Sequence, residues 1–330
     1  MSNNLPVSYK AWCWHKAGLP TEMTLQTVPL QPLGADEALV QNAAIGLNPV
    51  DWKVIANPDM EWDAGKVPGV DGAGVVVAVG VAVAPALVGR RVAYHQSLYK
   101  PGSFAEYTPV AAKALLTVPD AVNFTTAAGF PCPALTAWIA LEKVPLRKGA
   151  AVLISGAGGA VGHYLTQLAV ARGFAVTAMC NERHWQRLRA FGVTDFLPGP
   201  VTAGDALPPS HHDRFFAVID SVNGAHALLL APAVEANGHI VCIQGRLEDW
   251  PDEPFTRTIS LHEVALGATH DFGNAAGWQR LMEAGNDMLQ QIAAKTLMPE
   301  DLVTDTFSNL PQLLDSLRNR KFSGKPVIQF

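Results

Sequence analysis

The stretch Ala151-Val-Leu-Ile-Ser155, followed directly by Gly156-Ala-Gly-Gly-Ala-Val-Gly162, decides the fold of this chain. The first five residues form a short apolar run that predicts a buried strand. The glycine-rich stretch predicts a tight turn, and the apolar residues that follow recur at helical spacing, at Val161, Leu165, Leu168 and Ala169. Strand, glycine turn and helix in this order are typical of a dinucleotide-binding site.

The chemistry of this glycine loop suits a pyrophosphate. Small residues let the backbone approach the ligand, and the free N–H groups and dipole at a helix N-terminus favour negative charge. The strict G-x-G-x-x-G pattern read from Gly156 fails at Val161, and the pattern read from Ala157 is A-x-G-x-x-G. An ordinary strand-to-helix turn is therefore the alternative. The residues predicted to contact the cofactor are Gly156, Ala157, Gly158, Gly159, Ala160, Val161 and Gly162.

The next predicted strand bears on the choice of dinucleotide. It ends Met179-Cys180-Asn181, without the acidic residue that NAD-type sites commonly place there for the ribose 2′-hydroxyl. Arg183 follows, and a guanidinium suits a 2′-phosphate through paired charge-assisted hydrogen bonds. The sequence thus favours NADPH over NADH, with Asn181 and Arg183 as contacts. Alternatively, Arg183 is a solvated residue at a helix start.

Strand-like and helix-like segments alternate around the glycine loop. The alternation predicts a parallel sheet covered on both faces. Its strands are expected at residues 151–155, 175–179, 216–220, 238–243 and 264–268.

The flanks of this region have a different texture. Short β-type runs separated by Gly and Pro precede it and predict a barrel-like, all-β domain, with strands at 39–41, 74–83, 91–94 and 104–107. After Asp271 we expect a helix to about Thr296, then a strand, a helix and a strand at 303–307, 310–320 and 326–330. This tail could pack back onto the first domain.

Length and composition restrict the class of protein. A chain of 330 residues suggests two domains, and 49% apolar residues allow substantial cores. A net charge of -5 without a long Lys/Arg run argues against a nucleic-acid partner. We find neither an apolar signal core nor a run of about 20 apolar residues, so we expect a soluble, cytoplasmic protein without a membrane partner. The 4 cysteines form no C-x-x-C pair, and we expect reduced thiols.

Four stretches carry a resemblance to a known family: Asn48-Pro-Val-Asp-Trp-Lys53, Pro68-Gly-Val-Asp-Gly-Ala-Gly74, Gly102-Ser-Phe-Ala-Glu-Tyr107 and Leu135-Thr-Ala-Trp138. In their order and spacing the chain resembles the medium-chain dehydrogenases/reductases, and among them the zinc-independent, quinone oxidoreductase-like branch. The resemblance implies an α/β fold: a GroES-like β-barrel domain at 1–124, a Rossmann doubly wound parallel-sheet domain binding NADP at 125–269, and a C-terminal return to the barrel at 270–330. It also implies a homodimer joined through an edge strand near 261–268, which would otherwise be exposed.

The resemblance also locates a missing metal site. Zinc-dependent relatives hold their catalytic metal with Cys where this chain has Asn48, with His where it has Val70, and with a further Cys or Asp near Cys132. Valine has no donor atom and an amide is a poor zinc ligand, so we predict no zinc. Without a Lewis acid, we expect the acceptor to be a quinone or an α,β-unsaturated carbonyl compound, because hydride transfer to either produces a resonance-stabilised oxyanion.

Three residues of the first stretch are candidates for catalysis. Asn48 could hydrogen-bond the substrate oxygen or the nicotinamide ribose, or be a turn residue ahead of Pro49. Lys53 could donate to the developing oxyanion, or be a solvated surface lysine. Asp51 could orient Lys53 or cap the following helix.

Further candidates come from other segments. An aromatic-friendly substrate pocket could be walled by Trp52, His95, Tyr99 and Phe104, although such aromatic residues are more often core. Additional cofactor contacts are expected from Thr136, Ser221, Gly245 and Thr269. Two other functions stay open at this point: a dinucleotide-binding sensor or structural protein with little catalysis, and a zinc-type alcohol dehydrogenase, which conflicts with Asn48 and Val70.

Overall fold

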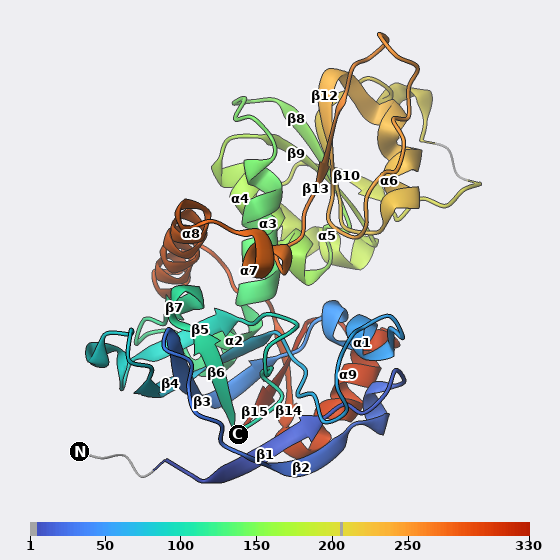
Figure 1. Cartoon of the computed structure of the whole chain (residues 1–330). Coiled ribbons are helices and arrows are strands. Elements are labelled where there is room, and N and C mark those ends of the chain that lie inside the picture. Colours follow the sequence, from blue (N-terminus) through green and yellow to red (C-terminus); the bar gives the residue numbers. More distant parts are fainter. Residues whose placement is uncertain (1–4, 205–206) are drawn as a thin grey trace. The chain divides into compact units, whose positions relative to one another are not determined.

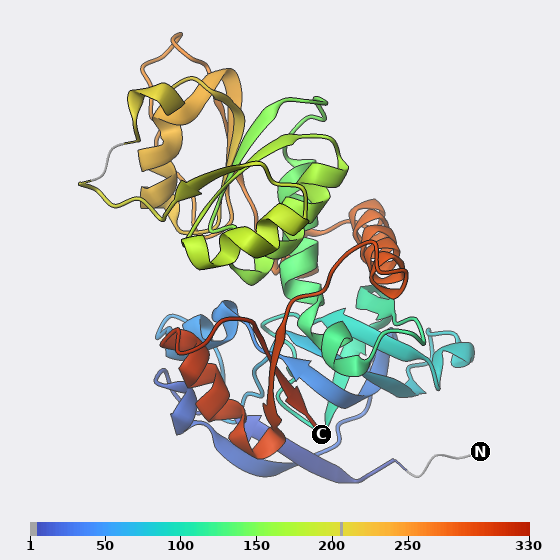
Figure 2. The same ribbon diagram turned by 180° about the vertical axis from the view of Figure 1, so that it is seen from behind.

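The structure is a computed structural model that describes residues 5–204 and 207–330 (Figures 1 and 2). The chain forms two compact units. The first contains the residues up to Cys132 together with Gly267–Phe330, and the second is Pro133–Leu266. The C-terminal segment therefore belongs to the same unit as the N-terminal one. Within the described ranges, no helix is long and apolar enough to cross a bilayer.

The first unit is built on a seven-stranded sheet in the order β14-β15-β3-β4-β5-β7, with β6 paired to β3. Its strands are β3 (Glu37–Gly46), β4 (Asp71–Val79), β5 (Arg91–His95), β6 (Tyr107–Ala111), β7 (Leu115–Thr117), β14 (Leu302–Thr306) and β15 (Lys325–Gln329). The antiparallel pairing of β15 with β3 joins the tail to the N-terminal part. A separate hairpin contains β1 (Ser8–Cys13) and β2 (Thr24–Pro29).

Helices complete this unit: α1 (Pro49–Ala56), α2 (Phe124–Gly129), α7 (Ala268–Phe272), α8 (Ala275–Ala293) and α9 (Leu310–Arg318). Leu310, Leu313 and Leu314 recur at helical spacing along one face of α9, and that face enters the core. The same core contains Ile55 of α1 and Ile328 of β15. Packing through this core therefore holds α1, which carries the candidate catalytic residues, against segments from the far end of the sequence.

The second unit has a six-stranded parallel sheet in the order β10-β9-β8-β11-β12-β13. The strands are β8 (Ala151–Ser155), β9 (Ala175–Cys180), β10 (Asp195–Pro198), β11 (Phe215–Asp220), β12 (Val234–Cys242) and β13 (Ser260–Glu263). This is the strand order of a Rossmann fold, so the predicted fold class is confirmed. Helix α4 (Ala160–Ala171) packs on β8 and β9, while α6 (Gly224–Leu230) packs on β11 and β12. The remaining helices of the region are α3 (Pro131–Glu142) and α5 (Trp185–Ala190).

Three of the strand predictions were wrong in position. The last strand of the parallel sheet is β13 (Ser260–Glu263), whereas residues 264–268 lead into α7. Val264 and Leu266 are buried, and apolar burial alone does not distinguish a strand from an ordered loop. Residues 80–83 turn away after β4, and most of 104–107 is irregular, with Phe104 in the core.

Strands β1, β2, β7 and β10 were not foreseen. Five of the six β2 side chains are exposed and the sixth is intermediate, so this strand has no alternation of apolar and polar residues to reveal it. Strand β10 spans only Asp195–Pro198 and lies at an edge of its sheet. Such short edge strands leave little periodic signal.

Candidate cofactor and active site

The glycine loop joins β8 to α4 at the carboxyl end of a central strand of the parallel sheet. Gly156 has φ +68°, a conformation that favours glycine. A Cβ on Gly162 would lie 2.5 Å from the Cα of Ala157, so glycine is what allows α4 to pack this closely. A Cβ on Gly159 would have only the Gly156 carbonyl oxygen nearby, at 3.5 Å. The loop is therefore tight on its inner side and open at Gly159.

The open side of this loop has the donors that a dinucleotide needs. Ala160, Val161 and Gly162 form the first turn of α4, whose N–H groups have no carbonyl partner within the helix. Ser221 follows β11, and its Cβ would lie 3.1 Å from a Cβ on Gly156. Among the described residues, the buried Oγ of Ser221 has no hydrogen-bond partner. Since buried hydroxyls normally have one, this orphaned group beside a helix N-terminus fits a bound pyrophosphate or ribose.

The residues after β9 also border this edge of the sheet. Asn181 accepts a hydrogen bond from the Arg183 N–H at 3.1 Å, and Arg183 itself is exposed. A second arginine, Arg187, donates from Nη2 to the Gly158 carbonyl at 2.9 Å. Arg187 was not among the residues predicted from the sequence, and its hydrogen bond ties the glycine loop to α5.

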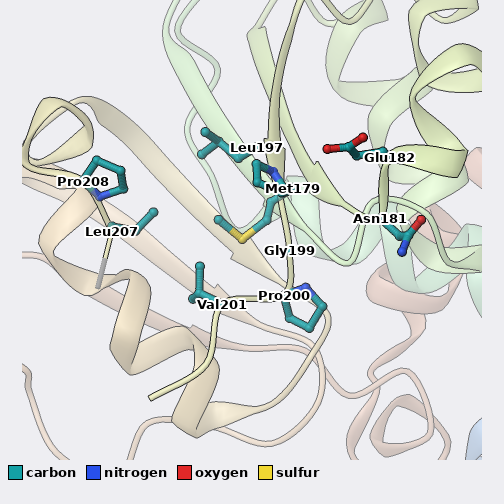
Figure 3. Close-up of a pocket in the computed structure, with 10 residues that line it drawn as sticks. Met179, Asn181, Glu182, Leu197, Gly199, Pro200, Val201, Leu207 and Pro208 are labelled. Atoms are coloured by element: carbon teal, nitrogen blue, oxygen red, sulfur yellow. The ribbon is translucent and has the colours of Figure 1, made fainter. Parts of the chain in front are cut away.

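A cavity of about 630 Å³ adjoins Asn181 and Glu182 (Figure 3). Its lining is mainly apolar, with the Met179 side chain in the middle and polar groups only at the Asn181 and Glu182 end (Figure 3). The apolar lining consists of Met179, Leu197, Pro198, Gly199, Pro200, Val201, Leu207 and Pro208. The cavity thus follows the carboxyl ends of β9 and β10.

The other predicted cofactor residues lie in three different places. Gly245 follows β12 with φ +88°. Thr136 lies within α3 and is 8% exposed. Thr269 lies in α7, which belongs to the first unit. Within the second unit, the structure therefore brings together the glycine loop, Ser221 and the Asn181–Arg183 segment.

The first unit contains a buried polar cluster that we call the acid–lysine cluster: Asn48, Asp51, Asp71 and Lys325. Asn48 Nδ2 donates to Asp71 Oδ2 at 2.9 Å, and its Oδ1 accepts from Lys325 Nζ at 2.5 Å. Lys325 Nζ also lies 3.7 Å from Asp71 Oδ2. Both aspartates are fully buried, and Lys325 is only 2% exposed.

Burial dominates the electrostatics of the acid–lysine cluster. It raises the pKa of Asp51 to about 7, against hydrogen bonds from the backbone of Asn48 and Val70 that favour the carboxylate. Burial likewise raises the pKa of Asp71 to about 6, with the Lys325 charge as the main opposing effect. Proton occupancy of the two acids therefore changes near neutral pH.

The three candidate catalytic residues have different environments in the structure. Asp51 accepts the Asn48 N–H at 2.7 Å and the Val70 N–H at 3.2 Å, so it caps α1. Asn48 is 3% exposed and uses both ends of its amide within the acid–lysine cluster. Lys53 is exposed, with Nζ 5.8 Å from the Trp52 ring centre. Burial of its stem and then the charge of Arg320 lower the pKa of Lys53.

Comparison with known proteins assigns the chain to a family. Residues 34–120 match the alcohol dehydrogenase GroES-like domain. The chain is 30% identical over 225 residues to a chloroplast envelope quinone oxidoreductase homolog of Arabidopsis thaliana, covering 66% of this chain and 68% of the relative. It is 31% identical over 275 residues to the trans-enoyl reductase opdC of Penicillium oxalicum, covering 76% and 73%. The chain belongs to the medium-chain dehydrogenase/reductase superfamily. It is therefore an NAD(P)-binding oxidoreductase of that superfamily.

The solved structures agree at the level of the fold. The quinone oxidoreductase from Coxiella burnetii superposes with a TM-score of 0.80 at 20% sequence identity, covering 98% of this chain and 99% of that chain. The GroES-like and Rossmann parts expected from the sequence are thus both present.

In this medium-chain dehydrogenase/reductase, the positions of the family's zinc ligands converge on the two buried acids. Asn48 bonds to both Asp51 and Asp71, the Val70 N–H to Asp51, and the Cys132 N–H to Asp71 at 3.0 Å. In the described part of the chain, no three His, Cys, Asp or Glu side chains are grouped so as to hold a metal ion. Asp71 is contacted by the Asn48 amide, the Cys132 N–H and the Lys325 ammonium.

The four residues predicted to wall a substrate pocket have different environments. Phe104 is fully buried in the core, and Trp52 packs partly buried against the same core. Tyr99 is 62% exposed. His95 is 6% exposed, and its Nδ1 lies 3.2 Å from Nε2 of His270, a residue of α7 that the sequence did not reveal. Of the four, His95 alone combines burial with a polar partner from the C-terminal segment.

Burial keeps this histidine pair neutral. It lowers the pKa of His95 to about 3, helped by the charges of His270 and Lys325. It also lowers the pKa of His270 to about 4. At neutral pH one ring therefore donates its N–H to the other without carrying charge.

Proposed function

We propose that this chain is an NADPH-dependent, zinc-independent oxidoreductase that transfers hydride to a quinone or an α,β-unsaturated carbonyl acceptor. The observation that carries the proposal is the glycine loop, where the free first turn of α4 meets the unpartnered Ser221 hydroxyl. When bound, the nicotinamide supplies a hydride, and the acceptor gains that hydride and one proton.

The preference for NADPH rests on the residues after β9. Arg183 is exposed beside Asn181, at the place where a ribose 2′-substituent is expected. Its guanidinium can form paired hydrogen bonds with the 2′-phosphate of NADPH. NADH has a 2′-hydroxyl at this position and lacks the phosphate oxygens that such a pair requires. The neighbouring apolar cavity, with Asn181 at one end, has a lining that suits the adenine ring.

The choice of acceptor follows from the missing zinc ligands and from the relatives. A quinone and an enoyl compound, the acceptors implied by the two relatives' names, both contain a carbonyl conjugated to a C=C bond. Hydride addition to such a compound puts negative charge on an oxygen, which hydrogen-bond donors can stabilise without a metal. We assign that donor role to Lys53, and we assign to Asn48 and Asp51 the positioning of α1 and hence of Lys53.

A turnover assay tests the proposed function. NADPH oxidation should be observed with quinones and enones, whereas simple alcohols should not reduce NADP⁺, and a chelator should leave the rate of NADPH oxidation unchanged. Activity lost on chelation and restored by zinc would contradict the zinc-independent mechanism. Tight NADPH binding without turnover on any acceptor would instead favour a nucleotide sensor.

Replacement of Arg183 tests the cofactor preference. R183A should raise the KM for NADPH about tenfold, because it removes a charge-assisted pair, and should leave the KM for NADH nearly unchanged. R189A, an exposed arginine of α5, is the matched control. Equal effects of R183A on both cofactors would rule out a 2′-phosphate contact.

We further propose a homodimer formed through β13. This strand ends the parallel sheet, and no strand in the described residues pairs with its outer edge. Pairing with a second copy would satisfy those backbone groups. Sedimentation equilibrium should give twice the chain mass, and a monomer at assay concentration would contradict the proposal.

A further inference from the structure

Asp220, the last residue of β11, is the centre of a second buried network. Its Oδ2 accepts the backbone N–H groups of Val222 and Asn223, each at 2.9 Å. Its Oδ1 accepts the Ser155 hydroxyl and lies 2.5 Å from Nδ1 of His226. Asp220 and Ser155 are fully buried, and His226 is 4% exposed. The carboxylate is thus saturated by protein donors.

The hydrogen bonds of His226 define its protonation. Its Nε2 accepts the backbone N–H of Val201 at 3.2 Å, which requires a lone pair on that nitrogen. The ring proton therefore resides on Nδ1 and is donated to Asp220. A single neutral imidazole thereby connects the Asp220 carboxylate to the backbone at Val201.

This connection spans loops that leave the carboxyl ends of three strands. Ser155 directly precedes the glycine loop, and Val222 and Asn223 follow the unpartnered Ser221. Val201 belongs to the segment after β10 that lines the cavity shown in Figure 3. The carboxyl edge of a parallel sheet is where dinucleotides bind, so the network underlies the expected cofactor surface.

Val201 is a suitable anchor for the cavity rim. Pro198 and Pro200 have no backbone N–H, so this segment has few donors with which to attach itself to the rest of the unit. The Val201 N–H is bonded to an imidazole that is itself held by Asp220. Loss of the acceptor would release the rim while leaving the glycine loop bonded to Asp220 through Ser155.

We propose that His226 is a positioning residue for the adenosine half of the cofactor: through Asp220 and Val201 it fixes the cavity rim relative to the glycine loop. The inference rests on the proposed dinucleotide-binding function. His226 is buried beneath the cavity rim and is assigned no contact with the cofactor. It acts on the affinity for adenosine and leaves the hydride-transfer step unchanged.

Two substitutions separate the two hydrogen bonds of the imidazole. In H226N the amide nitrogen takes roughly the place of Nδ1, so the bond to Asp220 is retained and the acceptor for Val201 is lost. In H226Q the amide oxygen takes roughly the place of Nε2, so the acceptor is retained and the donor to Asp220 is lost. The probes are NADPH, 2′,5′-ADP as its adenosine half, and reduced nicotinamide mononucleotide as the half without adenosine.

We expect H226N to raise the Kd of NADPH and of 2′,5′-ADP by a common factor of about ten, as measured by calorimetry. H226Q should raise both by less than about threefold. Turnover at saturating NADPH, and turnover with reduced nicotinamide mononucleotide, should stay at the wild-type level in H226N. A general loss of stability would not raise the Kd of NADPH and 2′,5′-ADP while leaving turnover unchanged.

Other results would overturn the proposal. One is an unchanged Kd for 2′,5′-ADP in H226N; another is a similar rise in H226N and H226Q accompanied by an equal loss of thermal stability. If H226N does not fold, V201P removes the donor itself, leaves His226 bonded to Asp220, and should raise the same two Kd values. Failure of the wild-type protein to bind either NADPH or NADH would reject the proposed function and, with it, this inference.

Discussion

Each unit of the molecule contains a buried carboxylate cluster, and the two clusters are built on different principles. In the second unit, Asp220 is saturated by a hydroxyl, an imidazole and two backbone N–H groups. In the first unit, Asp51 and Asp71 lie near one lysine, and burial raises the pKa of both. The Asp220 cluster of the second unit ties loops together through neutral donors. In the acid–lysine cluster of the first unit, the raised pKa values of Asp51 and Asp71 mean that protonation changes near neutral pH.

Because of this difference, we expect substitutions in the two clusters to change different properties of the protein. Hydrogen bonds to neutral donors fix geometry with little dependence on charge. A buried lysine beside two acids depends on its charge being compensated, because an unpaired buried charge is costly. Disruption of the acid–lysine cluster should therefore affect stability most, and disruption around Asp220 should affect cofactor affinity most.

The largest effect is expected from K325M, which removes the ammonium group that contacts Asn48 Oδ1 and Asp71 Oδ2. Asn48 Oδ1 then loses its donor and Asp71 its counter-charge, so the free energy of unfolding should fall by about 3–5 kcal/mol. Urea denaturation measures it. K321M, at an exposed lysine, should change stability by less than about 0.5 kcal/mol. Equal effects of the two substitutions would refute the structural role of Lys325.

The second effect is a dependence of stability on pH. Burial raises the folded-state pKa of Asp51 to about 7, so the folded chain retains a proton that the unfolded chain has released. The contribution of Asp51 to the free energy of unfolding is complete below the pKa that Asp51 has in the unfolded chain, and it is lost as the pH rises toward about 7. Asp71, with a pKa raised to about 6, adds to the same trend.

D51N tests this dependence, because asparagine keeps the shape of the side chain without titrating. Between about pH 5 and pH 6, the decline in unfolding free energy with pH should be smaller in D51N by about 1 kcal/mol per pH unit. Urea midpoints over this range provide the measurement. Parallel wild-type and D51N curves would show that Asp51 is ionised in the folded chain.

The sequence predicted the fold better than it predicted the two buried clusters. The glycine loop, the alternation after it and the four family stretches were local patterns, and they predicted both the doubly wound parallel sheet and the GroES-like domain. Lys325 and Asn48 are 277 positions apart, and their contact arises only because β15 pairs with β3. No local pattern encodes such a contact.

The same limit applies to His226 and His270. A histidine in a helical segment gives no sign of its partner, and the partners here, Val201 and His95, come from other elements. One signal was available: Lys325 opens an apolar strand, Pro326 to Ile328, where a charged residue needs a buried partner. Asp71 is the first residue of an apolar strand and Asp220 is the last residue of another, and at such positions an acidic side chain can bond to neighbouring segments.

The smallest effect is expected from S155A, which removes one of the donors to Asp220 and leaves the other three. Because the carboxylate remains bonded, the unfolding free energy should fall by only about 1 kcal/mol. The glycine loop begins at the next residue and loses its tie to Asp220, so the Kd of NADPH should still rise by about threefold. S210A, at an exposed serine, is the control. A loss of stability as large as that of K325M would show that the Asp220 network depends on charge compensation after all, and the contrast between the two units would not hold.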